Sequence, residues 1–245
     1  MRFKITLSYC GAPFRGWQIQ PNAPSVQQTL NEALSTLLGA DIGVTGAGRT
    51  DTGVNAINYV AHFDHSESIE TGELIYKLNA ILPPSVVVHD IEKVGDDFHA
   101  RYSAVRREYT YHIHRVKDPF AREFSYQYCY PELNFDEMNR ACTFLLGTKD
   151  FSCFEKTGAD NKTSVCTIFE AYWQKDDPVH WSFHIAADRF LRNMVRAIVG
   201  TLLEVGRGKR TAESITGLIE GKDRCGAGES VPGHALFLSK IEYFK

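Results

Sequence analysis

Residues 25 to 39 read SVQQTLNEALSTLLG, and this stretch predicts a helix with both ends marked. Ser25, followed three residues later by Gln28, forms a capping-box pair that supplies partners for the first amides of a helix. Gly39 ends the pattern, because glycine readily adopts the left-handed conformation that closes many helices. Apolar residues recur between these ends at helical spacing: Val26, Leu30, Ala33, Leu34, Leu37 and Leu38.

The sequence on either side of this helix alternates in the way that β-strands do. Residues 2–9, RFKITLSY, predict one strand, and residues 42–45 predict a short one. A helix near residues 71–81 and a strand over 86–94 complete the first part of the chain. One face of a further strand is expected to hold Ile57, Tyr59, Ala61 and Phe63. The predicted order is therefore β-α-β-β-α-β.

The remaining sequence predicts the same order of elements. Its first strand carries Arg107, Tyr109, Tyr111 and Ile113 on one face. The further elements are a helix over about 136–146, strands over 163–174 and 179–187, helices over 190–205 and 211–220, and a strand over 235–243.

Two such units predict an α+β fold made of two ferredoxin-like halves. The halves are expected over residues 1–103 and 104–245. Their paired antiparallel or mixed sheets would carry helices on the outside and leave a cleft between the halves.

The composition describes a globular chain of 245 residues, with 43% hydrophobic and 23% charged residues. It contains no signal peptide and no apolar run long enough to span a membrane, so we expect a cytoplasmic protein. Six scattered cysteines form no CxxC pair and are expected to be reduced. His112 and His114 alternate on one strand face, which more often meets water than metal, and we predict no metal.

The net charge of −3 hides two basic segments. Residues 101–122 contain six Lys or Arg against two Asp or Glu, and residues 189–210 contain six against one. Two basic segments in an otherwise acidic chain are able to form one face that attracts a polyanion. Two solvated faces without a partner are the alternative.

Residues 46–56 read GAGRTDTGVNA, with three glycines around one arginine and one aspartate. No Gly-Lys-Ser/Thr follows, so this is no phosphate loop, and Asp51 stands where a dinucleotide fingerprint needs its third glycine. The loop instead presents a carboxylate. On local sequence alone, however, an aspartate in such a loop is usually a turn or cap residue.

The loop resembles the active-site loop of the tRNA pseudouridine synthase A family, whose usual form is GRTDxGVHA with a catalytic aspartate. Other motifs of that family occur in the same order along nearly the whole chain. They are Gly16-Trp17-Gln18, DDFHARYSA from Asp96, Arg107-Glu108-Tyr109-Thr110-Tyr111, FLRNMVRAIVGTLLEVG from Phe190, and Lys222-Asp223-Arg224.

This resemblance implies an isomerase that converts uridine to pseudouridine in the anticodon stem-loop of tRNA, at positions 38 to 40 in tRNA numbering. It implies a homodimer without cofactor. Asp51 would be the catalytic carboxylate, and Arg196 would pair with it. Tyr109 would line the uracil pocket, and Arg49 would fill the place of the extruded base.

Some positions leave alternatives open. Thr52 and Asn55 replace the usual alanine and histidine, and an asparagine keeps a hydrogen bond but carries no proton. Tyr111 shares the strand face of Tyr109, so spacing does not separate the two. A helix from residue 190 would place Arg189, Arg192 and Arg196 on one face. Contacts with the RNA backbone are expected from Arg106, Arg107, Arg189 and Arg192.

The chemistry of the reaction agrees with one indispensable carboxylate, because no electrons are transferred. A carboxylate is able to attack as a nucleophile or to abstract a proton, and the sequence does not choose between these routes. Two rival functions remain. A non-catalytic RNA-binding module also presents aromatic residues on a sheet. A glycosylase also uses one carboxylate and a flipped nucleotide, but it would release free uracil.

Overall fold

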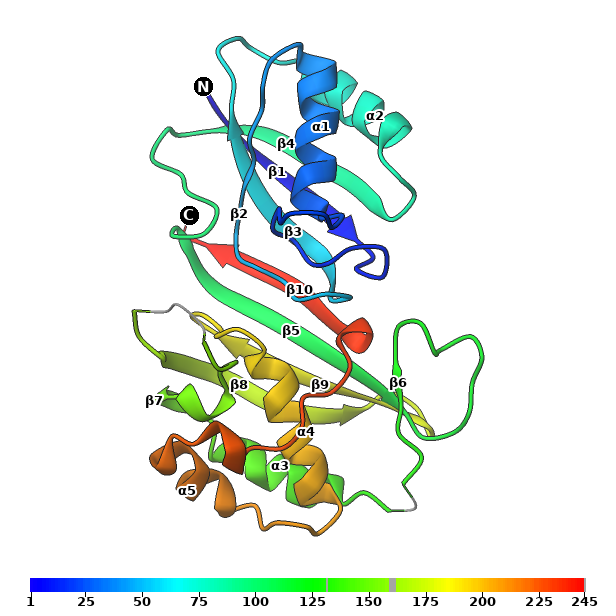
Figure 1. Cartoon of the computed structure of the whole chain (residues 1–245), viewed down its shortest axis with the longest axis vertical. Coiled ribbons are helices and arrows are strands. Elements are labelled where there is room, and N and C mark those ends of the chain that lie inside the picture. Colours follow the sequence, from blue (N-terminus) through cyan, green and yellow to red (C-terminus); the bar gives the residue numbers. More distant parts are fainter. Residues whose placement is uncertain (131, 159–161, 245) are drawn as a thin grey trace. The chain divides into compact units, whose positions relative to one another are not determined.

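The structure is a computed structural model, and it describes residues 1–130, 132–158 and 162–244 (Figure 1). It shows a mixed α/β protein whose chain divides into two compact units. The N-terminal unit holds residues 1–105 together with the chain from Phe237 onward, and the C-terminal unit holds residues 106–236. Within the described residues, no helix is both long enough and apolar enough to cross a membrane.

The sheet of the N-terminal unit has the strand order β4, β1, β3, β10. Strand β1 runs antiparallel to β3 and β4, and β10 runs parallel to β3. The short strand β2 pairs with β3, and the helix α2 packs on β4. The bounds are β1 Arg2–Tyr9, α1 Val26–Leu38, β2 Thr45–Gly46, β3 Asn55–Asp64, α2 Thr71–Ile81, β4 Val86–Val94 and β10 Leu236–Tyr243.

Helix α1 forms as its sequence predicts. The Ser25 hydroxyl accepts from the Gln28 amide at 3.2 Å, and Gly39 closes the helix with φ of 65°. The Gln28 side chain donates to Glu32 at 2.8 Å instead of returning to the cap. Four apolar residues of the helix are buried: Val26, Leu30, Ala33 and Leu34.

The alternation of buried and exposed residues predicted for β3 is wrong in two places. Ile57 is 47% exposed, whereas every residue from Tyr59 to Phe63 is buried. The alternation fails from Tyr59 to Phe63 because both faces of the strand are covered over these residues. Val60, on the second face, packs with Ala47 and Ala100. The short strand expected over 42–45 is reduced to Thr45–Gly46.

The C-terminal unit has its own antiparallel strands in the order β5, β9, β8, β7, with β6 parallel to β5. Helix α3 packs against α4 and β8. The bounds are β5 Ala104–His114, β6 Tyr126–Gln127, α3 Phe135–Thr143, β7 Gly147–Asp150, β8 Val165–Lys175, β9 His180–Ala187, α4 Met194–Gly206 and α5 Ser214–Gly221. Three short 3-10 helices are η1 Ser152–Phe154, η2 Arg224–Gly226 and η3 Gly233–Ala235.

Helix α4 begins four residues later than predicted. Asn193 has φ of 67°, a left-handed conformation that no helical residue adopts, so the helix starts at Met194. Arg189 and Arg192 therefore precede the helix. The expectation that they share a helical face with Arg196 is wrong.

The last strand belongs to a different part of the molecule than its sequence position suggests. Residues 104–245 were expected to form one half, but β10 joins the N-terminal unit. Phe237 pairs with Asn55 and Leu238 with Ala56, so β10 extends the sheet of β3. Alternation predicts that a strand exists and does not predict its partner.

Candidate active site

The loop between β2 and β3 places Asp51 in a tight turn of the N-terminal unit. The Asp51 carbonyl accepts from the Val54 amide at 3.1 Å, and Gly53 in the turn has φ of 76°. The neighbouring Thr50 is buried, and its hydroxyl lies 2.9 Å from that of Tyr9. Asp51 itself is half-buried and Arg49 is exposed. Thr50 is thus held in place, while Arg49 and Asp51 on either side of it are exposed or half-buried.

The Gly16-Trp17 motif packs against this loop. The Trp17 amide donates to the Thr50 carbonyl at 3.3 Å. Gly16 has φ of 95°, and a Cβ atom there would lie 2.4 Å from the Thr50 carbonyl oxygen. Trp17 stacks on Tyr59 with ring centroids 4.1 Å apart, and the Tyr59 hydroxyl bonds to the Gly48 carbonyl. Strand, motif and loop therefore form one packed base for Asp51.

Asn55 has a structural role at the end of the loop. It is 2% exposed, and its side-chain oxygen accepts from the Gly11 amide at 2.8 Å. Gly11 lies two residues after the end of β1. Asn55 therefore serves as a hydrogen-bond acceptor at the end of the loop.

The structure separates the two tyrosines of β5. Tyr111 is fully buried, and its hydroxyl donates to the Pro232 carbonyl at 3.0 Å. Burial raises the pKa of Tyr111 well above its usual value, which keeps this donor protonated. Tyr109 is half-buried and meets Phe190 edge to face at 5.1 Å. Tyr111 is a core residue, which favours Tyr109 as the residue that contacts a ligand.

Arg196 lies in the first turn of α4 and is bound to a neighbouring segment. Its Nε donates to the Val231 carbonyl at 2.7 Å, and its own carbonyl accepts from the Val231 amide at 3.2 Å. The direction of its guanidinium is thereby tied to Val231. Its pairing with Asp51 would join the two units and stays a prediction.

The four arginines expected at the RNA backbone differ in their surroundings. Arg106 is bound by Glu108 at 2.9 Å and by Glu170 at 2.8 Å, so its charge is compensated within the protein. Arg107 donates to the Asp188 carbonyl at 2.7 Å. Of the two that precede α4, Arg192 is exposed and Arg189 is half-buried.

The histidines of β5 face inward, which corrects the expectation that they meet water. His114 is fully buried with its Nδ1 3.0 Å from the Ser125 hydroxyl, and His112 is half-buried. Burial lowers the pKa of both rings below the usual value. His180 and His184 have the spacing HxxxH, but they lie on β9 rather than on a helix. Among the described residues, no group of three His, Cys, Asp or Glu side chains is arranged to hold a metal ion.

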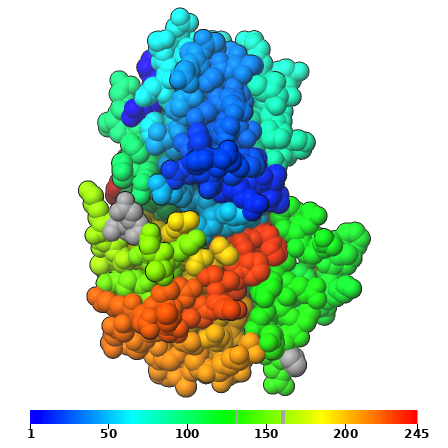
Figure 2. All heavy atoms as spheres, in the orientation of Figure 1, coloured from blue at the N-terminus to red at the C-terminus, as the bar shows by residue number. Residues whose placement is uncertain are grey.

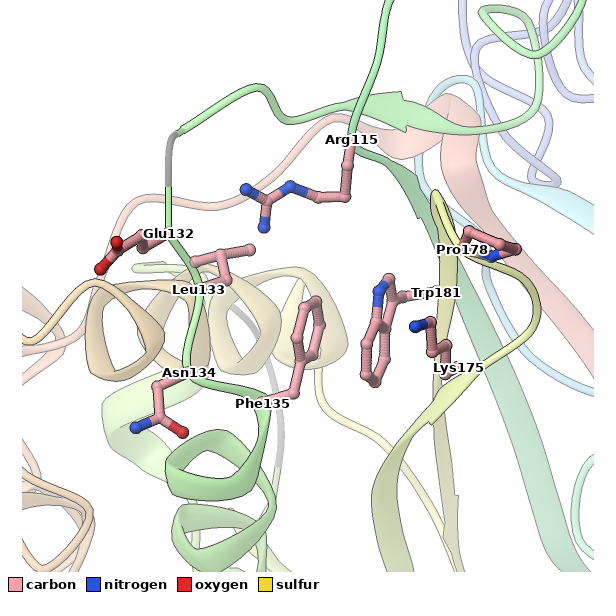
Figure 3. A pocket seen from close by; sticks show the side chains of 8 residues that line it. All are labelled: Arg115, Glu132, Leu133, Asn134, Phe135, Lys175, Pro178 and Trp181. Carbon is pink, nitrogen blue, oxygen red and sulfur yellow. The ribbon is translucent and has the colours of Figure 1, made fainter.

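An open pocket of about 530 Å³ lies in the C-terminal unit, near the start of α3 (Figure 3). The rings of Phe135 and Trp181 face one another in it, with centroids 3.5 Å apart. Its other lining residues are Arg115, Glu132, Leu133, Asn134, Lys175 and Pro178. None of the residues predicted for catalysis lines this pocket.

Comparison with known proteins decides the family. The family model described as tRNA pseudouridine synthase matches residues 141–244. The protein named tRNA pseudouridine synthase A from Bacteroides thetaiotaomicron is 50% identical over 244 residues, 99% of this chain and 90% of the relative. The proteins of that name from Bacteroides fragilis and Acetivibrio thermocellus are 49% and 41% identical, covering 99% and 98% of this chain and 96% and 98% of the relatives. The chain belongs to the tRNA pseudouridine synthase A family.

Two structural roles in this tRNA pseudouridine synthase were missed from the sequence. Tyr59 was assigned only to a strand face, yet it carries the Asp51 loop through Trp17 and Gly48. Arg224 was quoted as part of a motif without a role, yet it binds the segment that holds Arg196. The signal available in the sequence was that Arg224, a residue able to donate several hydrogen bonds, stands in a motif far along the chain from the Asp51 loop.

Proposed function

We propose that this chain converts uridine to pseudouridine in the anticodon stem-loop of tRNA, at positions 38 to 40, with Asp51 as the catalytic carboxylate. Membership of the tRNA pseudouridine synthase A family supports isomerisation of uridine in tRNA. The observation that carries the role of Asp51 is its loop. Thr50, directly before it, is bound to Trp17 and Tyr9, while Asp51 itself is only half-buried.

The reaction breaks the glycosidic bond at N1 of uracil, turns the base, forms a bond from the ribose to C5, and removes the C5 proton. Nucleophilic attack and proton abstraction both require an ionised carboxylate at a fixed position. Pre-organised positioning of this kind is a large part of catalysis. The packed base of Trp17, Tyr59 and Gly48 supplies it for Asp51.

The other predicted residues receive roles in the same proposal. Tyr109 stacks on uracil and assists the transfer of the C5 proton through its hydroxyl. Arg196 pairs with Asp51, and the exposed Arg49 fills the place that the extruded base leaves in the stem-loop. Backbone phosphates are contacted mainly by Arg107, Arg189 and Arg192. Arg106 contributes less, because Glu108 and Glu170 already compensate its charge.

The resemblance extends the proposal to assembly, architecture and compartment. The enzyme is a cytoplasmic homodimer, and its two ferredoxin-like halves enclose the cleft in which the base reacts. Size-exclusion chromatography with light scattering tests the assembly, and a monomer at micromolar concentration would contradict it.

The deciding experiment follows the C5 proton. tRNA carrying tritium at C5 of its uridines is mixed with the wild type, with Asp51→Asn, and with Asp41→Asn, an exposed aspartate of the same unit. We expect tritium release from the wild type and from Asp41→Asn, and a loss of at least about a thousandfold in Asp51→Asn. Transcripts with cytidine at positions 38 to 40 should release none.

The same reaction separates the rival functions. A glycosylase would release free uracil, which chromatography of the mixture detects, whereas a synthase retains the base in the chain. A binding module would release no tritium. It would also bind tRNA as well or better after Asp51→Ala, since a carboxylate near phosphates repels them.

A further inference from the structure

The segment from Ala227 to Pro232 lies against the first half of α4 and contacts Arg196, which is proposed for the site, and the core residue Tyr111. Val231 exchanges two hydrogen bonds with Arg196, at 2.7 Å and 3.2 Å. The next residue, Pro232, accepts from the Tyr111 hydroxyl at 3.0 Å. The position of the Arg196 guanidinium therefore depends on where this segment lies.

The segment contains no regular structure that would fix its own position. It follows the 3-10 helix η2 and precedes η3. Its residues have no assigned secondary structure beyond a bend, and Figure 2 shows the chain from α5 to η3, coloured orange to red, at the surface of the C-terminal unit. Contacts from outside the segment must hold it against α4.

Arg224 supplies the largest set of these contacts. One end of its guanidinium donates to the carbonyls of Ala227 and Gly228, at 3.5 Å and 3.3 Å. The other end donates to the Ser230 hydroxyl at 3.1 Å. The planar fork of arginine suits such a divided set of acceptors, whereas a lysine ammonium does not.

Ser230 links this arginine to the start of the helix. Its hydroxyl also accepts from the Asn193 side chain at 2.6 Å. Asn193 is the left-handed residue directly before α4, and Arg196 lies one turn further on. The chain of contacts thus runs from Arg224 through Ser230 to the first turn that carries Arg196.

The backbones of the segment and the helix approach too closely for side chains. A Cβ atom at Gly200 would lie 1.7 Å from the Glu229 carbonyl oxygen. The Gly228 amide donates to the Thr201 hydroxyl at 2.9 Å. The segment therefore has one well-defined seat on α4, and Arg224 holds it there.

We propose that Arg224 is a positioning residue for the isomerisation, because it holds residues 227–232 in the place that aims Arg196. It touches neither substrate nor the reacting atoms. The inference rests on the role proposed for Arg196. It assigns a function to the Lys222-Asp223-Arg224 motif, in which Asp223 caps η2 by accepting from the Cys225 amide at 2.8 Å.

Lys222 provides the matched control. It lies two residues from Arg224 and carries the same charge, but it pairs with Asp150 at 2.8 Å and does not bind the segment. Arg224→Ala and Lys222→Ala therefore remove equal charge from one loop, and only the first releases residues 227–232. Ser230→Ala removes the shared hydroxyl with a smaller change and serves if Arg224→Ala fails to fold by circular dichroism.

The first measurement separates chemistry from binding. At saturating tRNA in single turnover, we expect Arg224→Ala to slow tritium release at least about tenfold and Arg224→Lys to recover only part of the rate. The Kd for tRNA should change less than about threefold. Lys222→Ala should alter neither quantity more than about twofold. A wild-type rate in Arg224→Ala, or a loss confined to Kd, overturns the proposal.

The second measurement asks whether Arg224 acts through Arg196. In an Arg196→Ala background, adding Arg224→Ala should slow the residual reaction less than about twofold, since the residue being aimed is gone. A full additional loss in that background would show an effect independent of Arg196 and would contradict the proposal.

A third measurement needs no activity, so it keeps this inference distinct from the proposed function. Hydrogen exchange of the peptide over residues 227–236 should be faster in Arg224→Ala and unchanged in Lys222→Ala. If the wild type released no tritium, the proposed function would fail while this arm still tested the segment. Unchanged exchange in Arg224→Ala overturns the inference in either case.

Discussion

Asn55 has a structural role at the end of the Asp51 loop. It is buried and accepts from the Gly11 amide, so Asn55→Ala leaves that amide without its acceptor. We predict a loss of about 1 to 3 kcal/mol in the free energy of unfolding, measured by urea denaturation. Asn58→Ala is the control, because Asn58 is exposed and its bond to the Ser239 carbonyl is long, at 3.3 Å. Equal losses in the two variants would contradict the assignment.

His62 makes the N-terminal unit sensitive to acid. Burial, together with the charges of Arg2 and His99, lowers its pKa to about 4, while its Nδ1 accepts from the Ala100 amide at 3.1 Å. The unfolded ring titrates near about 6.5. Between these pH values the unfolded state binds more protons, so the free energy of unfolding falls as the pH falls.

We predict that His62 contributes about 1 to 3 kcal/mol to this loss between about pH 6.5 and pH 4. Urea denaturation of His62→Asn at several pH values should show a shallower slope than the wild type. His89→Asn, which changes an exposed histidine of the same unit, should leave the slope as it is. A slope that His62→Asn does not alter would show that other groups cause the acid sensitivity.

Among the elements, helix α4 depends on a glycine for its contact with the segment over it. Gly200→Ala would place a Cβ atom 1.7 Å from the Glu229 carbonyl oxygen, and that atom belongs to the backbone. We predict a loss of about 1 to 3 kcal/mol in the free energy of unfolding, despite the better helix propensity of alanine. Gly217→Ala in α5 has nothing within 4 Å and should stabilise by about 0.5 to 1 kcal/mol. Chemical denaturation compares the two, and stabilisation by both would refute the close approach.

The start of α4 marks where prediction from sequence ends. Elements whose signals are local, such as α1 with its cap at Ser25 and its stop at Gly39, form where expected. The start of α4 is set by the left-handed Asn193, and its side chain bonds to Ser230, a residue 37 positions away. Local periodicity does not contain such a contact. For the same reason, the sequence did not predict that the second face of β3 is covered or that β10 pairs with β3.

The sequence predicted which residues form the candidate site, but it did not predict the contacts that hold these residues in place. The loop motif indicated Asp51 and Arg49, and the strand motif indicated Tyr109 together with Tyr111. The burial of Tyr111 against Pro232 required the fold. The compensation of Arg106 by Glu170 also required it, because these two residues lie on different strands, β5 and β8.

For the binding of tRNA by the whole molecule, the distribution of charge matters more than the net charge of −3. Arg106 is neutralised by two carboxylates, so we predict that Arg106→Ala weakens tRNA binding less than Arg189→Ala or Arg192→Ala. Each true phosphate contact that is removed should also lower the slope of log K against log salt by about 0.7 to 0.9. Filter binding over a range of salt concentrations measures both. A larger effect at Arg106 would show that RNA displaces its glutamate partners.

The return of β10 to the N-terminal unit has a consequence for how the protein is made. The C-terminal unit is continuous from residue 106 to residue 236, whereas the sheet of the N-terminal unit includes β10, which is synthesised after that whole unit. Until β10 is synthesised, the nascent chain carries Asn55 and Ala56 of β3 without their β10 partners, next to the Asp51 loop. The sheet of the N-terminal unit, whose other strands are synthesised first, is therefore completed only after the whole C-terminal unit has been synthesised.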